Sequence, residues 1–124
     1  MNPKILIVDD SSLVRRQVGT ALGKAGFAID EAVDGLDALE KLAQAPDTAV
    51  VVCDVNMPRM NGIELLEQVR SKPALAAVPF LMLTTEGQPE IIGKAKTLGA
   101  KAWLIKPFKP DLLLAAVQKL SRVA

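Results

Sequence analysis

Short apolar runs alternate with amphipathic stretches along the whole 124-residue chain, and this alternation constrains the fold more than any other feature. Four runs are continuous and rich in branched side chains: residues 4–9, 49–54, 79–84 and 102–106. Such runs are typical of strands that are covered on both faces, as in a parallel sheet. A fifth run, residues 27–33, alternates apolar and polar side chains, as a less buried edge strand does.

The stretches between these runs carry helix start and stop signals. The first predicted helix begins after Ser11 and Ser12 and stops at Gly26. Four more helix starts are indicated by capping pairs or first-turn prolines: Asp34 with Asp37, Asn61 with Glu64, Pro89 and Pro110. Five strands alternating with five helices predict an α/β fold, with a parallel sheet and helices on both faces.

Composition excludes several classes of protein. One cysteine excludes a disulfide framework, and the absence of histidine removes most zinc sites and any self-contained phosphohistidine relay. No apolar run approaches the roughly 18 residues that span a bilayer, so we expect a cytoplasmic protein without membrane insertion. The net charge of +1 argues against nucleic-acid binding. Residues 87–124 nevertheless hold seven basic and two acidic side chains, which suggests a basic face for an acidic partner.

Polar side chains stand where four of the five predicted strands end. They are Asp9 and Asp10, Asp54, Thr84 and Lys106. Ligands of such folds bind at the carboxyl ends of the strands, so we expect these groups to converge in one shallow cleft. Asp34 follows the remaining predicted strand, residues 27–33, and is interpreted as a helix cap. The alternative, that all of these are caps and turn residues, does not explain why each directly follows an apolar run.

These residue types suit phosphoryl transfer. Three close carboxylates repel one another unless a cation is present, and oxygen ligands without histidine or thiolate suit Mg²⁺. A lysine ammonium and a threonine hydroxyl can both donate hydrogen bonds to phosphoryl oxygens. An aspartate can act as the nucleophile and form an acyl phosphate. The cluster therefore predicts a magnesium-assisted phosphoacceptor site.

Four segments at these strand ends resemble the response-regulator receiver domain, and the resemblance covers essentially residues 1–124 as one domain. They are residues 7–11 (IVDDS), 54–62 (DVNMPRMNG), 82–85 (MLTT) and 106–108 (KPF). The resemblance implies a doubly wound, flavodoxin-like or CheY-like sheet of strand order 2-1-3-4-5. It also implies a cis peptide bond before Pro107.

The resemblance further implies a role for each site residue. Asp54 would accept a phosphoryl group from a phosphohistidine of a sensor histidine kinase, while the chain assists its own phosphorylation and dephosphorylation without being an enzyme in the usual sense. Asp9, Asp10, Asp54 and the backbone carbonyl of Asn56 would hold Mg²⁺. Thr84 and Lys106 would bind the phosphoryl oxygens.

The chain ends just after the pattern of its last helix, so we expect its output to be a change in binding surface. The basic face, including Lys94, Lys101 and Trp103, is the expected output surface. Its partner would be the flagellar motor switch or another acidic peptide surface, because the chain resembles single-domain chemotaxis receivers, and we expect a monomer. Trp103 stands where the family usually has a switching Tyr or Phe, and is interpreted either as a switch or as a packing residue.

Other functions stay open at this point. A phosphorelay shuttle or a receiver excised from a longer protein would share the same site. A phosphatase of the haloacid dehalogenase type would need a second aspartate where this chain has Asn56. A flavodoxin would need a phosphate-binding loop rich in hydroxyl groups and glycine after the first strand, and aromatic side chains around the flavin.

Overall fold

The computed structural model describes residues 2–57, 59–85 and 89–121. Five strands and five helices alternate as predicted, and the strands form one parallel sheet of order β2-β1-β3-β4-β5. The elements are β1 (Lys4–Val8), α1 (Ser12–Lys24), β2 (Ala28–Ala32), α2 (Gly35–Gln44), β3 (Val50–Asp54), α3 (Gly62–Arg70), β4 (Phe80–Thr84), α4 (Pro89–Thr97), β5 (Ala102–Ile105) and α5 (Pro110–Ser121). The predicted fold class and strand order are confirmed.

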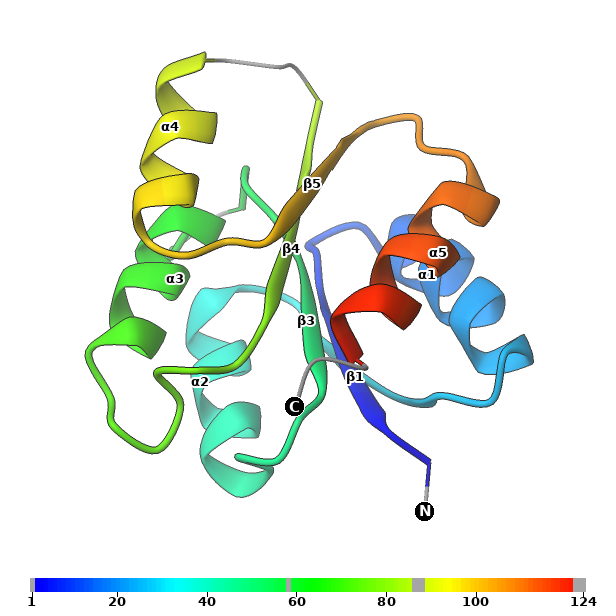
Figure 1. Cartoon of the computed structure of the whole chain (residues 1–124), viewed down its shortest axis with the longest axis horizontal. Coiled ribbons are helices and arrows are strands. Elements are labelled where there is room, and N and C mark those ends of the chain that lie inside the picture. The colour runs from blue at the N-terminus through cyan, green and yellow to red at the C-terminus, as the bar shows by residue number, and fades with distance from the viewer. Residues whose placement is uncertain (1, 58, 86–88, 122–124) are drawn as a thin grey trace.

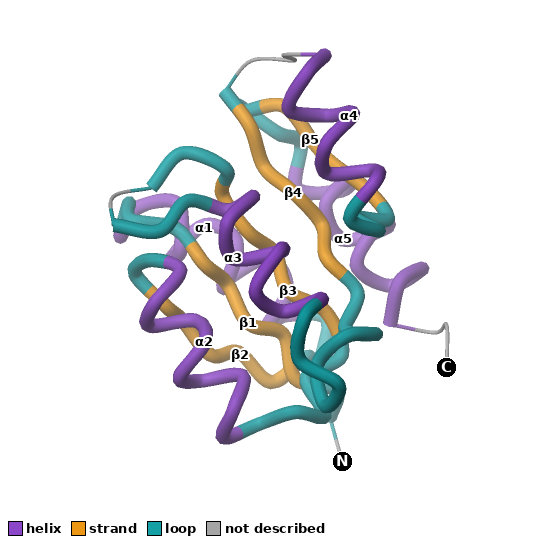
Figure 2. The backbone as a smooth tube through the Cα atoms, turned by 90° about the vertical axis from the view of Figure 1, so that its left-hand side faces the viewer, coloured by secondary structure: helices purple, strands orange, loops and turns teal. Residues whose placement is uncertain are grey.

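The helices cover both faces of the sheet. α1 and α5 lie on one face and α2, α3 and α4 on the other (Figures 1 and 2). Because strand side chains alternate, each face has its own core. Leu6 and Val51 pack with α2, α3 and α4, whereas Ile5 and Val52 pack with α1 and α5. The continuous apolar runs of β1, β3 and β4 are therefore explained by burial on both faces.

β5 differs from this expectation. The sequence predicts a strand covered on both faces, but none of the four residues of β5 is buried, and Ile105 is 52% exposed. The reason is its place at the edge of the sheet, where β4 is its one neighbouring strand. Trp103 packs partly against the core on the α2–α4 side and Leu104 against the other core. An apolar run alone does not distinguish half-covered from fully covered strands.

The helix caps follow the sequence signals with one difference. The Ser11 side chain accepts from the N–H of Val14, and Asn61 and Glu64 form a complete capping box at 2.9 and 3.0 Å. Asp34 caps α2 as expected. The Asp37 carboxylate, however, accepts from the N–H of Val33 at 3.1 Å instead of from Asp34 itself.

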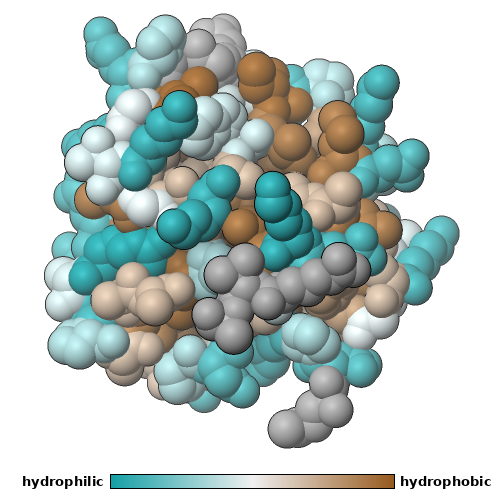
Figure 3. All heavy atoms as spheres, viewed as in Figure 1, coloured by the Kyte–Doolittle hydropathy of each residue, from teal (hydrophilic) through white to brown (hydrophobic). Residues whose placement is uncertain are grey.

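The surface mixes hydrophilic and hydrophobic side chains. Figure 3 shows hydrophobic atoms gathered in the upper right of the view, near the connection from β5 to α5. Ile105 and Leu112, which flank that connection, are both more than half exposed. Within the described ranges, no helix combines the length and the apolar character needed to cross a membrane.

Candidate functional site

Three carboxylates converge at one edge of the sheet. Asp9 and Asp10 directly follow β1, and Asp54 is the last residue of β3, the strand next to β1. One carboxylate oxygen from each of the three lies within 4.8 Å of the corresponding oxygens of the other two. Parallel neighbours end at the same edge of a sheet, which is why residues 45 positions apart in sequence meet here. The predicted convergence of the acidic residues is confirmed.

Lys106 joins this cluster from the end of β5. Its Nζ lies 2.9 Å from Asp9 Oδ2 and 3.3 Å from Asp54 Oδ1, and its side chain is 17% exposed. The backbone N–H of Lys106 donates to the carbonyl of Thr84 at 2.7 Å, and the peptide bond to Pro107 is cis. The ammonium group thus bridges two carboxylates and offsets part of their repulsion.

Asp9 and Asp10 have different surroundings although they are neighbours. Asp9 is fully buried, and its two carboxylate oxygens accept from the N–H of Ser11 at 2.8 Å and from Lys106 at 2.9 Å. Asp10 is exposed. Asp9 therefore orients the lysine and the loop, whereas Asp10 presents its carboxylate at the open side of the cluster.

The electrostatics of the cluster shift two pKa values. Burial raises the pKa of the Asp54 carboxyl, the negative charge of Asp9 raises it further, and Lys106 opposes both. Burial by itself would lower the pKa of Lys106, but its hydrogen bond to Asp9 and the charges of Asp54 and Asp9 outweigh burial and raise it. The lysine is consequently protonated at neutral pH.

The donor set fits a divalent cation of the Mg²⁺ type. Within the described part of the chain, these three aspartates are the group of acidic side chains close enough to share a metal ion. All of their donors are carboxylate oxygens, which Mg²⁺ prefers, and a cation would relieve the repulsion among them. Asn56, also predicted as a ligand, lies beside them, since its N–H points at Asp54 Oδ1 from 3.4 Å.

The loop from β3 to α3 depends on residues that sequence reasoning did not single out. The N–H of Gly62 donates to the carbonyl of Val55 at 2.9 Å, and a Cβ atom at position 62 would clash with the carbonyl oxygen of Asp54. Arg59 has a positive φ of 64° and its guanidinium pairs with the buried carboxylate of Asp34. The hydrogen bond from the Asp37 N–H is the main cause of the lowered pKa of Asp34, and Arg59 contributes. Asp34 is thus a cap that also anchors this loop.

The remaining predicted residues divide between two regions. Thr84 is buried at the carboxyl end of β4. It lies near the carboxyl end of β3, where Asp54 stands, because Leu83 pairs with Asp54 in the sheet register. Trp103 lies in β5 with the Lys96 ammonium 4.9 Å from its ring centre. Lys94, on α4, pairs with Glu67 of α3 at 3.1 Å. Lys101 is exposed before β5 begins, so these basic residues lie outside the acidic cluster.

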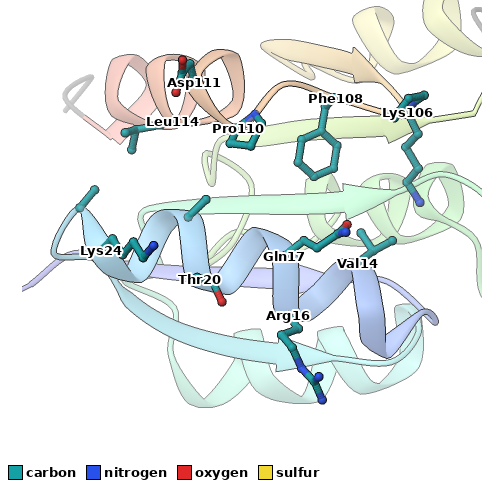
Figure 4. A pocket seen from close by; sticks show the side chains of 13 residues that line it. Val14, Arg16, Gln17, Thr20, Lys24, Lys106, Phe108, Pro110, Asp111 and Leu114 are labelled. Atoms are coloured by element: carbon teal, nitrogen blue, oxygen red, sulfur yellow. The ribbon is translucent and has the colours of Figure 1, made fainter.

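A large hollow of about 1000 Å³ lies beside the cluster, between α1 and α5. Figure 4 shows Phe108 pointing into it, while the Lys106 amine sits at one end. The three aspartates are not among its lining residues. The acidic cluster therefore lies at the strand ends, outside this hollow, and Lys106 borders both.

Comparison with known proteins agrees with this geometry. Residues 5–118 match the response regulator receiver domain family. The chain is 40% identical to the chemotaxis protein CheY1 of Helicobacter pylori over 111 residues, which is 89% of this chain and 90% of that protein. It is 38% identical to a chemotaxis protein CheY homolog of Campylobacter jejuni over 89% of this chain and 85% of that protein.

Solved structures point the same way. The Vibrio cholerae chemotaxis protein CheY4 superposes with a TM-score of 0.91 at 42% identity, over 97% of this chain and 99% of that one. A putative response regulator from Chloroflexus aurantiacus superposes with a TM-score of 0.91 at 30% identity, over 98% of both chains. These matches exclude the phosphatase and flavodoxin alternatives. The chain belongs to the response regulator receiver family.

Proposed function

We propose that this chain is a phosphorylation-activated switch of chemotaxis-type two-component signalling, with Asp54 as the phosphoacceptor. The observation that carries the proposal is the Lys106 ammonium between Asp54 and Asp9 at the end of the central strands. Relatives that are 38%, 40% and 42% identical to this chain are named as chemotaxis proteins. The chain acts as a signalling protein and not as a classical enzyme.

The proposed donor of the phosphoryl group is a phosphohistidine on a sensor histidine kinase. The chain contains no histidine, so a phosphohistidine donor must belong to another protein. An oxygen of the Asp54 carboxylate attacks the phosphorus atom. The nitrogen–phosphorus bond breaks, its electron pair stays on the imidazole, and an acyl phosphate forms on Asp54. Lys106 lies close enough to Asp54 to attract the phosphoryl oxygens, and the Thr84 hydroxyl donates to them.

Bound Mg²⁺, held by Asp9, Asp10, Asp54 and the Asn56 carbonyl, would neutralise charge on the carboxylates and the phosphoryl group. The chain's own residues supply the rest. Asp9 orients Lys106, and Asp10 offers an open oxygen ligand. The same arrangement would let water attack the acyl phosphate, so the chain would also assist its own dephosphorylation.

The proposed output surface consists of α4, β5 and α5. It carries Lys94 and Lys101, and Trp103 is half-buried within it. This charge suits an acidic helical or extended peptide, such as one from a flagellar motor switch. We propose that the chain works as a cytoplasmic monomer and binds neither nucleic acid nor membranes.

Acetyl phosphate with Mg²⁺ tests the nucleophile without a kinase. Wild type should gain one acid-stable, base-labile phosphoryl group, seen in the mass of the intact protein. Asp54→Asn should gain none, while Asp47→Asn, which removes an exposed carboxyl after α2, should label like wild type. Equal labelling of Asp54→Asn would place the chemistry elsewhere.

The fluorescence of Trp103, which is the one tryptophan of the chain, tests the output surface. Beryllofluoride, a mimic of the phosphoryl group, should change its emission in wild type in the presence of Mg²⁺. Thr84→Ala should abolish that change because it removes the hydroxyl that senses the group. An unchanged emission in the wild type would show that the responding surface does not include Trp103.

A further inference from the structure

Arg15 contacts the backbone that carries the two neighbouring aspartates. It is the fourth residue of α1, and its side chain is 14% exposed. Its Nη1 donates to the carbonyl oxygen of Asp9 at 2.6 Å, and its Nε donates to the Glu31 carboxylate on β2 at 3.0 Å. One guanidinium thus connects α1, β2 and the loop that follows β1.

The carbonyl that Arg15 holds belongs to the peptide joining Asp9 to Asp10. Asp9 has further restraints, because its N–H donates to the carbonyl of Ala32 and its carboxylate is held on both oxygens. The Asp10 carboxylate has no hydrogen bond or ion pair to any other described residue. The orientation of Asp10 therefore depends on its backbone, and Arg15 fixes the peptide plane that precedes it.

We propose that Arg15 is a positioning residue for divalent-cation binding, acting through the Asp9–Asp10 peptide. The inference deepens the proposed function, since it rests on the acidic cluster as the cation site. Groups that orient metal ligands from outside typically change metal affinity by about 10- to 100-fold when they are removed. Arg15 meets that description because it touches the ligand-bearing backbone and none of the three carboxylates.

Charge alone predicts the opposite effect. A guanidinium beside a cation site repels the cation, so its removal should tighten binding if Arg15 acted only through its charge. If Arg15 acts by holding the peptide plane, its removal should weaken binding. The sign of the change in Mg²⁺ affinity therefore distinguishes positioning from electrostatics.

The partner of Arg15 on β2 is a weaker part of the arrangement. Glu31 is 51% exposed, and ion pairs to exposed carboxylates contribute little. The carbonyl contact is shorter and part-buried. We therefore expect Glu31→Gln to alter Mg²⁺ affinity much less than a change at Arg15.

Isothermal titration of the full chain with Mg²⁺ tests the inference. Arg15→Ala should bind about 10-fold more weakly than wild type. Arg15→Lys, which restores a donor and the charge, should recover part of the loss. Arg16→Ala is the matched control, because Arg16 is the next residue of α1 and its side chain makes no ion pair or hydrogen bond within the described ranges. Figure 4 shows its side chain directed away from α5.

The outcomes separate the two proposals. If wild type does not bind Mg²⁺, the proposed function fails. If wild type binds it and Arg15→Ala binds equally well or more tightly, the positioning role is overturned and the proposed function stands. Thermal melting without Mg²⁺ identifies an unfolded variant, and in that case the comparison of Arg15→Lys with wild type decides: equal affinity overturns the inference.

Discussion

The proposed acceptor side, made by β3 and α3, and the proposed output side, made by α4 and β5, are built from elements of similar length but different packing. α3 and α4 have nine residues each, yet α3 buries five and α4 buries one, Ala95. All five residues of β3 are buried, whereas β5 buries none of its four. Elements with few buried contacts open at lower free energy. From this comparison we infer that a rigid core holds the proposed phosphoacceptor, Asp54, and that α4 and β5 supply the proposed conformational response.

The weaker packing of α4 is not uniform along the helix. The Lys94–Glu67 pair is exposed on both sides, and Lys96 lies over Trp103, so these contacts add little stability. At the carboxyl end of α4 the contacts are stronger. The Arg70 guanidinium donates to the carbonyls of Leu98 and Gly99 at 2.7 and 3.2 Å. We infer that α4 is anchored at this end and responds mainly along the remainder of the helix.

The largest expected difference in stability is between substitutions at two leucines that are neighbours on β4 and β5. Leu83 is fully buried and Leu104 is half-buried, and the two are partners in the sheet register. Leu83→Ala should lower the free energy of unfolding by about 2–5 kcal/mol. Leu104→Ala should cost clearly less. Urea denaturation measures both, and equal losses would contradict the difference in packing.

Mg²⁺ should stabilise the acceptor side strongly. A cation that binds only the folded protein adds about 2.7 kcal/mol to the free energy of unfolding when its concentration is 100 times its dissociation constant. Asp10→Ala should lose most of this gain and, without metal, should equal or exceed wild type in stability because one repelling charge is gone. Thermal melting with and without Mg²⁺ measures this linkage. A wild-type melting temperature that does not respond to Mg²⁺ would count against the carboxylate site.

A glycine-to-alanine substitution should lower stability on the proposed acceptor side and raise it on the proposed output side. Gly62→Ala places a Cβ against the Asp54 carbonyl and should destabilise the fold by about 1–3 kcal/mol. At Gly93 a Cβ meets no atom within 4 Å, so Gly93→Ala should stabilise α4 by about 0.5–1 kcal/mol through helix propensity. Amide exchange in α4 and urea denaturation report the two changes. Destabilisation by Gly93→Ala would show that α4 is packed more tightly than we describe.

The smallest effect concerns Asp34, whose pKa lies below its ordinary value of 3.8. A carboxyl with a lowered pKa in the folded state contributes stability above pH 3.8 and loses it as the pH falls through the lower folded value. Asp34→Asn keeps the cap but loses the charge. It should therefore cost about 1 kcal/mol or less at pH 7, and the difference from wild type should shrink as the pH falls below 3.8. Urea denaturation between pH 7 and 3 checks this, and a difference that grows in acid would contradict it.

The sequence predicted the site better than the parts that support it. Asp9, Asp54 and Lys106 were identifiable because each directly follows an apolar run, and parallel topology then brings strand ends together. The contacts of Arg15 were not identifiable, since its two partners come from different elements and depend on the reach of its side chain. The half-covered β5 was also missed because its apolar run resembles those of the buried strands. Local patterns therefore reveal caps and strand ends, whereas long-range contacts to backbone carbonyls require the structure.

We propose that a rigid site binds a phosphoryl group on Asp54 and that α4 and β5 change conformation in response. Amide hydrogen exchange measured by mass spectrometry, with and without Mg²⁺ and beryllofluoride, tests this most directly. We predict that exchange changes most within residues 89–105, changes least in β1 and β3 away from the site, and does not change in Asp54→Asn. An equal change in Asp54→Asn, or a response confined to β1 and β3 while residues 89–105 stay unaltered, would contradict the account.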